Sequence, residues 1–178
     1  MAAPAATSAD ARAGERQAWW RSSWLLAALA VVTALAVAAA VALFVIDRRD
    51  QQVSDARTAA VAAARGHAET ILSYDHTTLD EDFAAALAVS TGGFADEYRE
   101  TSESVVRDTA TETEAVVEAE TVTAGVVSAE PERVVVLVFV NQTTTSNRLD
   151  QAQTDLNRVR MTLVDTGQGW LVEAVEAL

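Results

Sequence analysis

The chain has 178 residues, enough for one domain with additional segments, and a formal net charge of −13. Nucleic-acid binding requires a basic surface, so this acidic balance argues against nucleic acid as a partner and against docking of the soluble part on anionic lipid headgroups. The absence of cysteine excludes disulfides, thiolate metal sites and lipidated cysteines.

Residues 1–23 are rich in Ala, Ser and Pro and lack periodicity, which predicts a disordered tail. Residues 24–46 contain no charged side chain. As a helix they would extend ~35 Å, against ~30 Å for the hydrocarbon core of a bilayer. Trp19, Trp20 and Trp24 are typical of an interfacial aromatic belt. A cleaved signal peptide is the alternative, but its apolar region is only ~7–15 residues long. The sequence therefore predicts an uncleaved single-pass transmembrane helix over residues 24–46.

The basic residues that flank this apolar segment do not set its orientation. Equal numbers of Arg lie close to each end, namely Arg12, Arg16 and Arg21 before it and Arg48, Arg49 and Arg57 after it. Because the positive-inside rule counts basic residues and gives little weight to acidic ones, the topology cannot be derived from charge.

Small side chains recur every four residues along one face of the predicted membrane helix, at Ala30, Ala34, Ala38 and Ala42. Such a stripe allows close approach of two helices, so it is a predicted interface. Ala is also the most frequent residue of this segment, so composition alone is an alternative explanation.

Residues 47–178 carry 24 acidic and 10 basic side chains, a net charge of −14. Three helices are predicted at the start of this region. The first covers residues 47–73 and places Val53, Ala56, Ala60, Ala64, Ala68 and Ile71 or Leu72 on one face. The second begins at Thr78, whose spacing from Glu81 predicts a capping box, and ends at Gly92-Gly93. The third covers Phe94 to about Thr109.

The period then changes to two, which is typical of strands. Strands are predicted over residues 114–129, 133–142, 156–165 and 169–177, separated by turn signals. Helices followed by a meander of strands predict an α+β domain, with a bent four-stranded antiparallel sheet wrapped on three helices.

The strand over residues 133–142 is apolar on both faces. Val134, Val136, Val138 and Val140 share one face, and Val135, Leu137 and Phe139 share the other. A half-exposed strand should alternate apolar and polar residues, so one face is a predicted protein contact surface. This surface is formed by Val134, Val136 and Val138 or by Val135 and Leu137, depending on which face the helices cover. A central strand whose back is covered by neighbouring side chains is the alternative.

Three segments resemble the actinobacterial Mce (mammalian cell entry)-associated membrane proteins. They are SYDHTTLDEDFAAALAVSTGGFADEYRETS (73–102), AGVVSAEPERVVVLVFVNQTTTS (124–146) and NRVRMTLVDTGQGWLVEAVEAL (157–178). The resemblance implies a cytoplasmic tail over residues 1–23 and an extracytoplasmic domain over residues 47–178, cone-shaped and similar to nuclear transport factor or cystatin. It also implies a place in the cell membrane beside Mce-type lipid and sterol importers.

A cone-shaped domain can hold an active site, and enzymes of this shape use Asp, His or Tyr inside an apolar cone. The pocket candidates are Tyr74, Asp75, Asp80 and Tyr98, with His76 beside them. The simpler interpretation is that these residues end helices, begin helices or belong to the core. No phosphate loop, nucleophile elbow, metal-ligand spacing or cofactor motif is present, so we predict a protein that is not an enzyme and has no catalytic, cofactor or metal residues.

Three functions remain open. The main hypothesis is an accessory or scaffold subunit of an Mce-type lipid or sterol import system, with transporter subunits, other Mce-associated proteins or a second copy as partners. The alternatives are a module that binds lipid or sterol in the cone, and an assembly protein like those of type IV secretion. An open apolar cavity of a few hundred Å³ would favour the binding module.

Overall fold

The computed structural model describes the backbone of residues 10–178 and, apart from Trp24, the side chains from Ala27 onward. The chain divides into two compact units at Arg48/Arg49, and each unit is described here by itself. Helix α1, Asp10–Leu72, contributes residues to both. Residues 1–9 of the predicted disordered tail and the side chains of Trp19 and Trp20 lie outside the described residues.

The part of α1 in the first unit is long and apolar enough to cross a membrane. Its most apolar window has a mean hydropathy of 2.9, and none of that window is buried within the protein. The helix already begins at Asp10, so residues 10–23 of the predicted disordered tail are helical. Ala, Arg, Glu and Gln have high helix propensity, and extending an existing helix avoids the cost of nucleation, which explains the difference.

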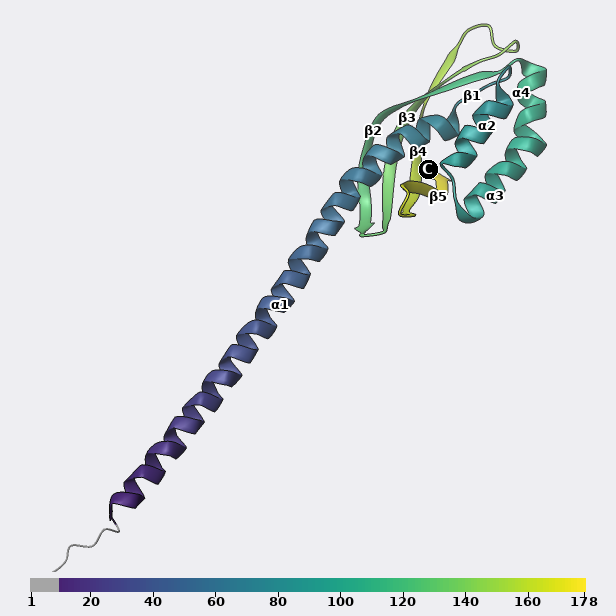
Figure 1. The fold of residues 1–178 in the computed structure, drawn as a ribbon. Coiled ribbons are helices and arrows are strands. Elements are labelled where there is room, and N and C mark those ends of the chain that lie inside the picture. Colours follow the sequence, from purple (N-terminus) through teal and green to yellow (C-terminus); the bar gives the residue numbers. More distant parts are fainter. Residues whose placement is uncertain (1–9) are drawn as a thin grey trace, which may run out of the picture. The chain divides into compact units, whose positions relative to one another are not determined.

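The second unit contains a five-stranded sheet, counted over the described residues, in the order β1-β2-β3-β4-β5 (Figure 1). All neighbouring strands are antiparallel. The strands are β1 Tyr74–Asp75, β2 Val116–Glu130, β3 Arg133–Thr145, β4 Gln153–Asp165 and β5 Trp170–Ala177. The sheet therefore has one strand more than the sequence predicts, because the two residues of β1 are too few to show a period.

Helix α1 covers one face of this sheet through a row of small side chains. Ala56, Ala60, Ala64 and Ala68 are buried and pack against the β3 residues Val134, Val136, Val138 and Val140. Small side chains let the helix approach the sheet closely, while large β-branched residues of β3 fill the space beneath it. The predicted inward face of the helix is confirmed.

The remaining helices are α2 Leu79–Ala88, α3 Gly92–Thr101, η1 Ser102–Val106 and α4 Arg107–Thr113. The predicted third helix is thus longer and contains a turn of π-helix, η1. The prediction that Gly92-Gly93 ends the second helix is wrong, because α2 ends at Ala88 and Gly92 opens α3 with a φ of +61°. That backbone conformation favours glycine, which explains the residue type at this turn.

The prediction that Val134, Val136 and Val138 form an exposed contact surface is wrong. All are fully buried beneath α1, and the outward side chains of β3 are Val135, Leu137 and Phe139, which are half-buried. The sequence alone could not decide between the two faces, because both are apolar and a strand presents them equally.

Candidate functional site

The interior of the α+β domain contains a small cavity of about 140 Å³. Tyr74 of β1, Phe83 of α2 and Tyr98 of α3 line it, and Phe83 and Tyr98 meet edge to face with ring centroids 6.3 Å apart. The other lining residues are Ile71, Leu72, Thr101, Ser102, Val106 and Gln142. Sites for drug-sized ligands enclose ~300–1,000 Å³, so the protein's own side chains largely fill this cone.

Two of the four predicted pocket residues, Tyr74 and Tyr98, meet at this cavity, whereas Asp75 and Asp80 do not line it. Asp75 Oδ1 accepts hydrogen bonds from the backbone N–H (2.8 Å) and hydroxyl (2.7 Å) of Thr77, so it stabilises a turn. Asp80 is exposed and forms an ion pair with Arg107 at 2.8 Å. The carboxylates are therefore structural and solvent-facing.

The start of α2 differs from the predicted capping box. The Thr78 hydroxyl donates to Asp82 Oδ2 at 3.0 Å, and no side chain caps the helix. The same Asp82 oxygen accepts from the Asp75 backbone N–H at 2.9 Å. Asp82 thus ties β1 to α2, which a local spacing rule could not predict because the β1 position depends on pairing with β2.

The electrostatics of the cavity keep its tyrosines neutral. Burial, followed by the nearby Asp82 carboxylate and Tyr74, raises the pKa of Tyr98 to about 12. Burial also raises the pKa of Tyr74 above its ordinary value. The hydrogen bonds from Thr77 lower the pKa of Asp75. All three shifts move the pKa values of Tyr74, Tyr98 and Asp75 away from neutral pH, whereas a general acid or base needs a pKa near the operating pH.

The raised pKa of Tyr98 predicts a loss of stability in alkali. The folded protein holds this proton more tightly than the unfolded chain, so its contribution is complete below pH 10 and is lost as the pH rises from 10.0 to about 12. Urea unfolding of residues 49–178 across this range should show a falling free energy of unfolding, with a shallower fall in Tyr98→Phe. Identical pH profiles for the two proteins would contradict the prediction.

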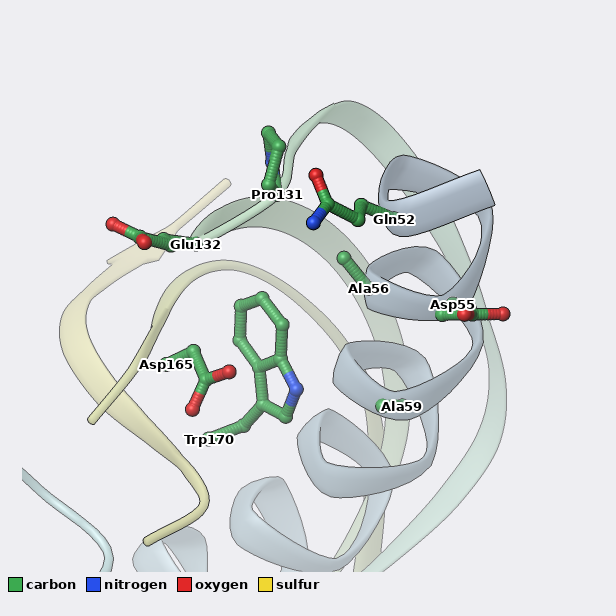
Figure 2. Close-up of a pocket in the computed structure, with 8 residues that line it drawn as sticks. All are labelled: Gln52, Asp55, Ala56, Ala59, Pro131, Glu132, Asp165 and Trp170. Atoms are coloured by element: carbon green, nitrogen blue, oxygen red, sulfur yellow. The ribbon is translucent and has the colours of Figure 1, made fainter. Parts of the chain in front are cut away.

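A second hollow, of about 430 Å³, lies where the end of the sheet meets the first turns of α1 in this unit. Figure 2 shows Asp165 against the ring of Trp170 and the Gln52 amide turned toward Pro131, while Asp55 and Glu132 point away. We call this hollow the Trp170 groove. Its carboxylates do not converge, and among the described residues no group of three or more His, Asp or Glu is placed to hold a metal ion. A carboxylate rim beside an indole ring suits a cationic side chain of a partner.

Sequence reasoning missed the Trp170 groove because its residues come from α1 and from two different turns. The only available signal was the glycine-flanked turn before Trp170, where Gly167 and Gly169 have φ values of +75° and +144°. Asp165 Oδ1 accepts the Gly167 backbone N–H at 2.9 Å, which fixes the turn. His67 Nε2 lies 2.8 Å from the Trp170 carbonyl oxygen and links α1 to β5.

The outer face of the sheet carries a surface of apolar side chains, which we call the outer apolar surface. It consists of the half-buried Val135, Leu137 and Phe139 of β3. On the β2 side, Phe139 pairs with Thr123 and Leu137 with Gly125, and the exposed Val122 and Val127 are the extra residues at two irregularities of this register. On the other side, Phe139 pairs with Arg158 and Leu137 with Arg160. Long Arg stems can cover part of such a surface, which accounts for its half-burial.

The alanine stripe of the membrane helix lies in the first unit. Ala30, Ala34, Ala38 and Ala42 all lie within α1 and are exposed in the single chain. The stripe is thus free to contact another helix, and its role as an interface stays a prediction.

These features define a class: an α+β domain attached to a helix of membrane-spanning length, with a filled interior and an uncovered apolar sheet face. The chain belongs to the family described as "Uncharacterized protein Rv1363c/MT1408-like", whose model matches residues 22–177. That description contains no reference to Mce proteins.

Relatives from Mycobacterium tuberculosis agree with this membership. Uncharacterized protein Rv1362c is 37% identical over 126 residues, which cover 70% of this chain and 57% of that protein. This chain thus matches little more than half the length of that relative. Outer membrane protein Rv1973 is 34% identical over 123 residues, covering 69% of this chain and 76% of that protein.

Solved structures show the same fold at low sequence identity. The periplasmic domain of DotI has a TM-score of 0.57 at 14% identity, covering 68% of this chain and 94% of that one. An IcmL-like type IV secretion system protein from Legionella pneumophila has a TM-score of 0.56 at 10% identity, covering 66% and 88%. CagV, a VirB8 homolog from Helicobacter pylori, has 0.52 at 10% identity, covering 67% and 96%. The α+β class with a curled antiparallel sheet, as in VirB8-type domains, is confirmed.

Proposed function

We propose that this chain is a non-enzymatic, membrane-anchored subunit that assembles with other proteins of the cell envelope. The observation that carries this proposal is the uncovered outer apolar surface on a domain whose own interior is filled. Removing a half-buried apolar side chain such as Leu137 from water against a protein partner is favourable in free energy. Neutral tyrosines and dispersed carboxylates argue against acid–base catalysis.

The solved structures support an assembly role by analogy of fold. The IcmL-like protein and CagV are described as type IV secretion system proteins, and the domain of DotI is described as periplasmic. A fold hosts many functions, so this analogy favours a subunit of a multiprotein complex and does not specify the complex.

A second candidate is an accessory subunit of an Mce-type lipid or sterol importer. The specific observation in its favour is the sequence resemblance over residues 73–102, 124–146 and 157–178 to Mce-associated membrane proteins. Direct binding of lipid or sterol inside the cone is the weaker version of this candidate, because the cavity of about 140 Å³ is small for such a ligand. Transporter subunits and further copies of this chain are the proposed partners.

For topology, we propose a cytoplasmic N-terminus, with residues 47–178 on the outer side of the cell membrane. The support is the family resemblance together with the tendency of long domains to translocate regardless of flanking charge. Alkaline phosphatase fused after Leu178 should be active in intact cells, because this enzyme requires an extracytoplasmic environment. An inactive phosphatase fusion, combined with an active cytoplasmic reporter at the same position, would reverse the topology.

The assembly function is tested by purifying the full chain from native membranes and quantifying the proteins that co-purify. The proposal expects a reproducible set of envelope proteins in fixed ratio to the chain. Mce transporter components among them would select the second candidate, and secretion-type components would select the first. A chain that purifies alone or only as a homo-oligomer, from membranes that contain those systems, would contradict both.

A further inference from the structure

Strand β2 lies at the edge of the sheet over most of its length. Its only neighbour on that side, among the described residues, is β1, and Tyr74–Asp75 pair only with Val117 and Val116 at its start (Figure 1). An edge strand presents unpaired backbone N–H and C=O groups, and these are a template for another strand.

Side chains of α1 protect the next part of this edge. Ser73 Oγ accepts the backbone N–H of Ala119 at 2.9 Å, and Glu69 Oε1 accepts that of Thr121 at 3.0 Å. Beyond Thr121, the described part of the chain provides no hydrogen-bond partner for the outer edge of β2. The open edge is therefore the stretch from Thr123 to Ala129.

The register identifies the backbone groups that face outward along the open edge. In antiparallel sheets, alternate residues direct their N–H and C=O toward one neighbour and then the other. Thr121 bonds to Glu69 and not to Val140, its partner in β3. Ala124 pairs with Val138 and Val126 with Val136, which lie two and four residues from Val140 along β3. Because the direction alternates residue by residue, the N–H and C=O groups of Ala124 and Val126 also point away from β3.

The sequence of the open edge lacks the charged residues and prolines that usually protect an edge strand from pairing. No charged residue and no proline occurs between Glu120 and Glu130. The two register irregularities, at Val122 and Val127, leave Thr123–Val126 in regular register with β3. Val126 is 38% exposed, and a Cβ placed on Gly125 would meet no atom within 4 Å. The described residues therefore leave space around Gly125 and Val126 for an additional strand.

Charge determines which strand fits. A second copy of β2 could pair antiparallel with this edge and use the outward amides of Ala124 and Val126 in both copies. This pairing is centred on Gly125. It places Glu120 of one copy directly opposite Glu130 of the other. Like charges directly opposite each other are destabilising. Glu118 lies beside Glu120 before the open edge, and Glu132 lies beside Glu130 after it, so both ends of the open edge are acidic. The complementary occupant is an extended segment with an uncharged centre and basic ends.

We propose that the open edge of β2 binds an extended segment of another protein by strand addition, with Ala124 and Val126 supplying the backbone hydrogen bonds and Glu120 and Glu130 selecting basic ends. Strand addition takes affinity from main-chain hydrogen bonds and specificity from the side chains around them. The inference extends the assembly function to a defined surface and a defined partner chemistry. Its test needs no envelope complex, so its failure would leave that function standing.

The test uses the full chain in detergent micelles and two synthetic peptides. Both have a centre of alternating Thr and Val, one with two Arg at each end and the other with two Glu. Fluorescence anisotropy should show that the Arg-ended peptide binds and that binding weakens with salt. Hydrogen exchange should slow at the amides of Ala124 and Val126 when this peptide is present.

Val126→Pro removes an outward N–H and no hydrogen bond to β3, so it should weaken binding by at least about tenfold, the effect of losing one or two hydrogen bonds. Val126→Thr keeps the N–H and a similar shape and should bind normally. As a second variant, Glu120→Arg/Glu130→Arg should reverse the preference toward the Glu-ended peptide, whatever the folding of the proline variant.

The proposal is overturned if neither peptide binds, if the charge-reversed chain keeps its preference, or if a folded Val126→Pro chain binds as tightly as Val126→Thr. Protection of the Ala124 and Val126 amides in the full chain without any peptide, rising with protein concentration, would also overturn it. That result would assign the edge to a second copy.

Discussion

Replacing Val138 by Asp is expected to unfold the domain of residues 49–178, whereas replacing the adjacent Leu137 by Asp is expected to leave it folded. Val138 is fully buried beneath α1, and Leu137 is half-buried on the outer face of the same strand. A carboxyl group at Val138 loses its water without gaining a partner, and such changes cost at least about 4–5 kcal/mol. Small domains have only ~5–15 kcal/mol of total stability.

Circular dichroism and urea unfolding of the two variants measure this difference directly. The Leu137 variant is the matched control, because it introduces the same charge one residue away on the opposite face. A folded Val138→Asp domain together with an unfolded Leu137→Asp domain would mean that α1 covers the other face of β3.

The second large effect concerns assembly. Val135→Glu/Leu137→Glu places two charges on the outer apolar surface, and we expect it to abolish co-purification of the full chain with its partners. An interface centre is depleted of charged residues, because an unpaired carboxylate must be desolvated there. Both side chains lie outside the core, so the domain itself should stay folded and monomeric.

Val105→Glu/Leu149→Glu is the matched control for the assembly experiment. It makes two apolar-to-Glu changes at side chains that are 57% and 38% exposed and lie in η1 and in the loop between β3 and β4, outside the sheet. This control should retain normal co-purification. If the Val135/Leu137 variant also assembles normally, the partners contact another surface, and the half-exposed residues of β3 serve only the sheet.

Much of the fold follows from local patterns that the sequence carries by itself. An uncharged run from Trp24 to Ile46 needs a nonpolar environment wherever it lies, so its membrane-spanning length is visible without a structure. The recurrence of Ala56, Ala60 and Ala64 every four residues places them on one side of any helix, and the structure confirms that this side is the buried one.

Of the predicted pocket residues, the structure brings together only those whose burial follows from their own chemistry. Tyr74 and Tyr98 meet at the cavity, as large aromatic side chains in a core do. Asp75 and Asp80 are neighbours of these residues in the chain but point to a turn and to Arg107. Proximity along the sequence therefore did not predict where these side chains point, because the chain turns between neighbouring residues and directs their side chains to different sides.

The tertiary structure alone decided which face of β3 is core, where the edge of β2 stays open and how the Trp170 groove is formed. An apolar strand such as residues 134–140 has two equivalent faces until a helix covers one of them. The bulge residues Val122 and Val127 change the side of the strand on which the next residues lie, and only pairing with β3 reveals them. Helix and strand periods are properties of a single segment, whereas faces, edges and grooves arise when segments distant in the chain pack together.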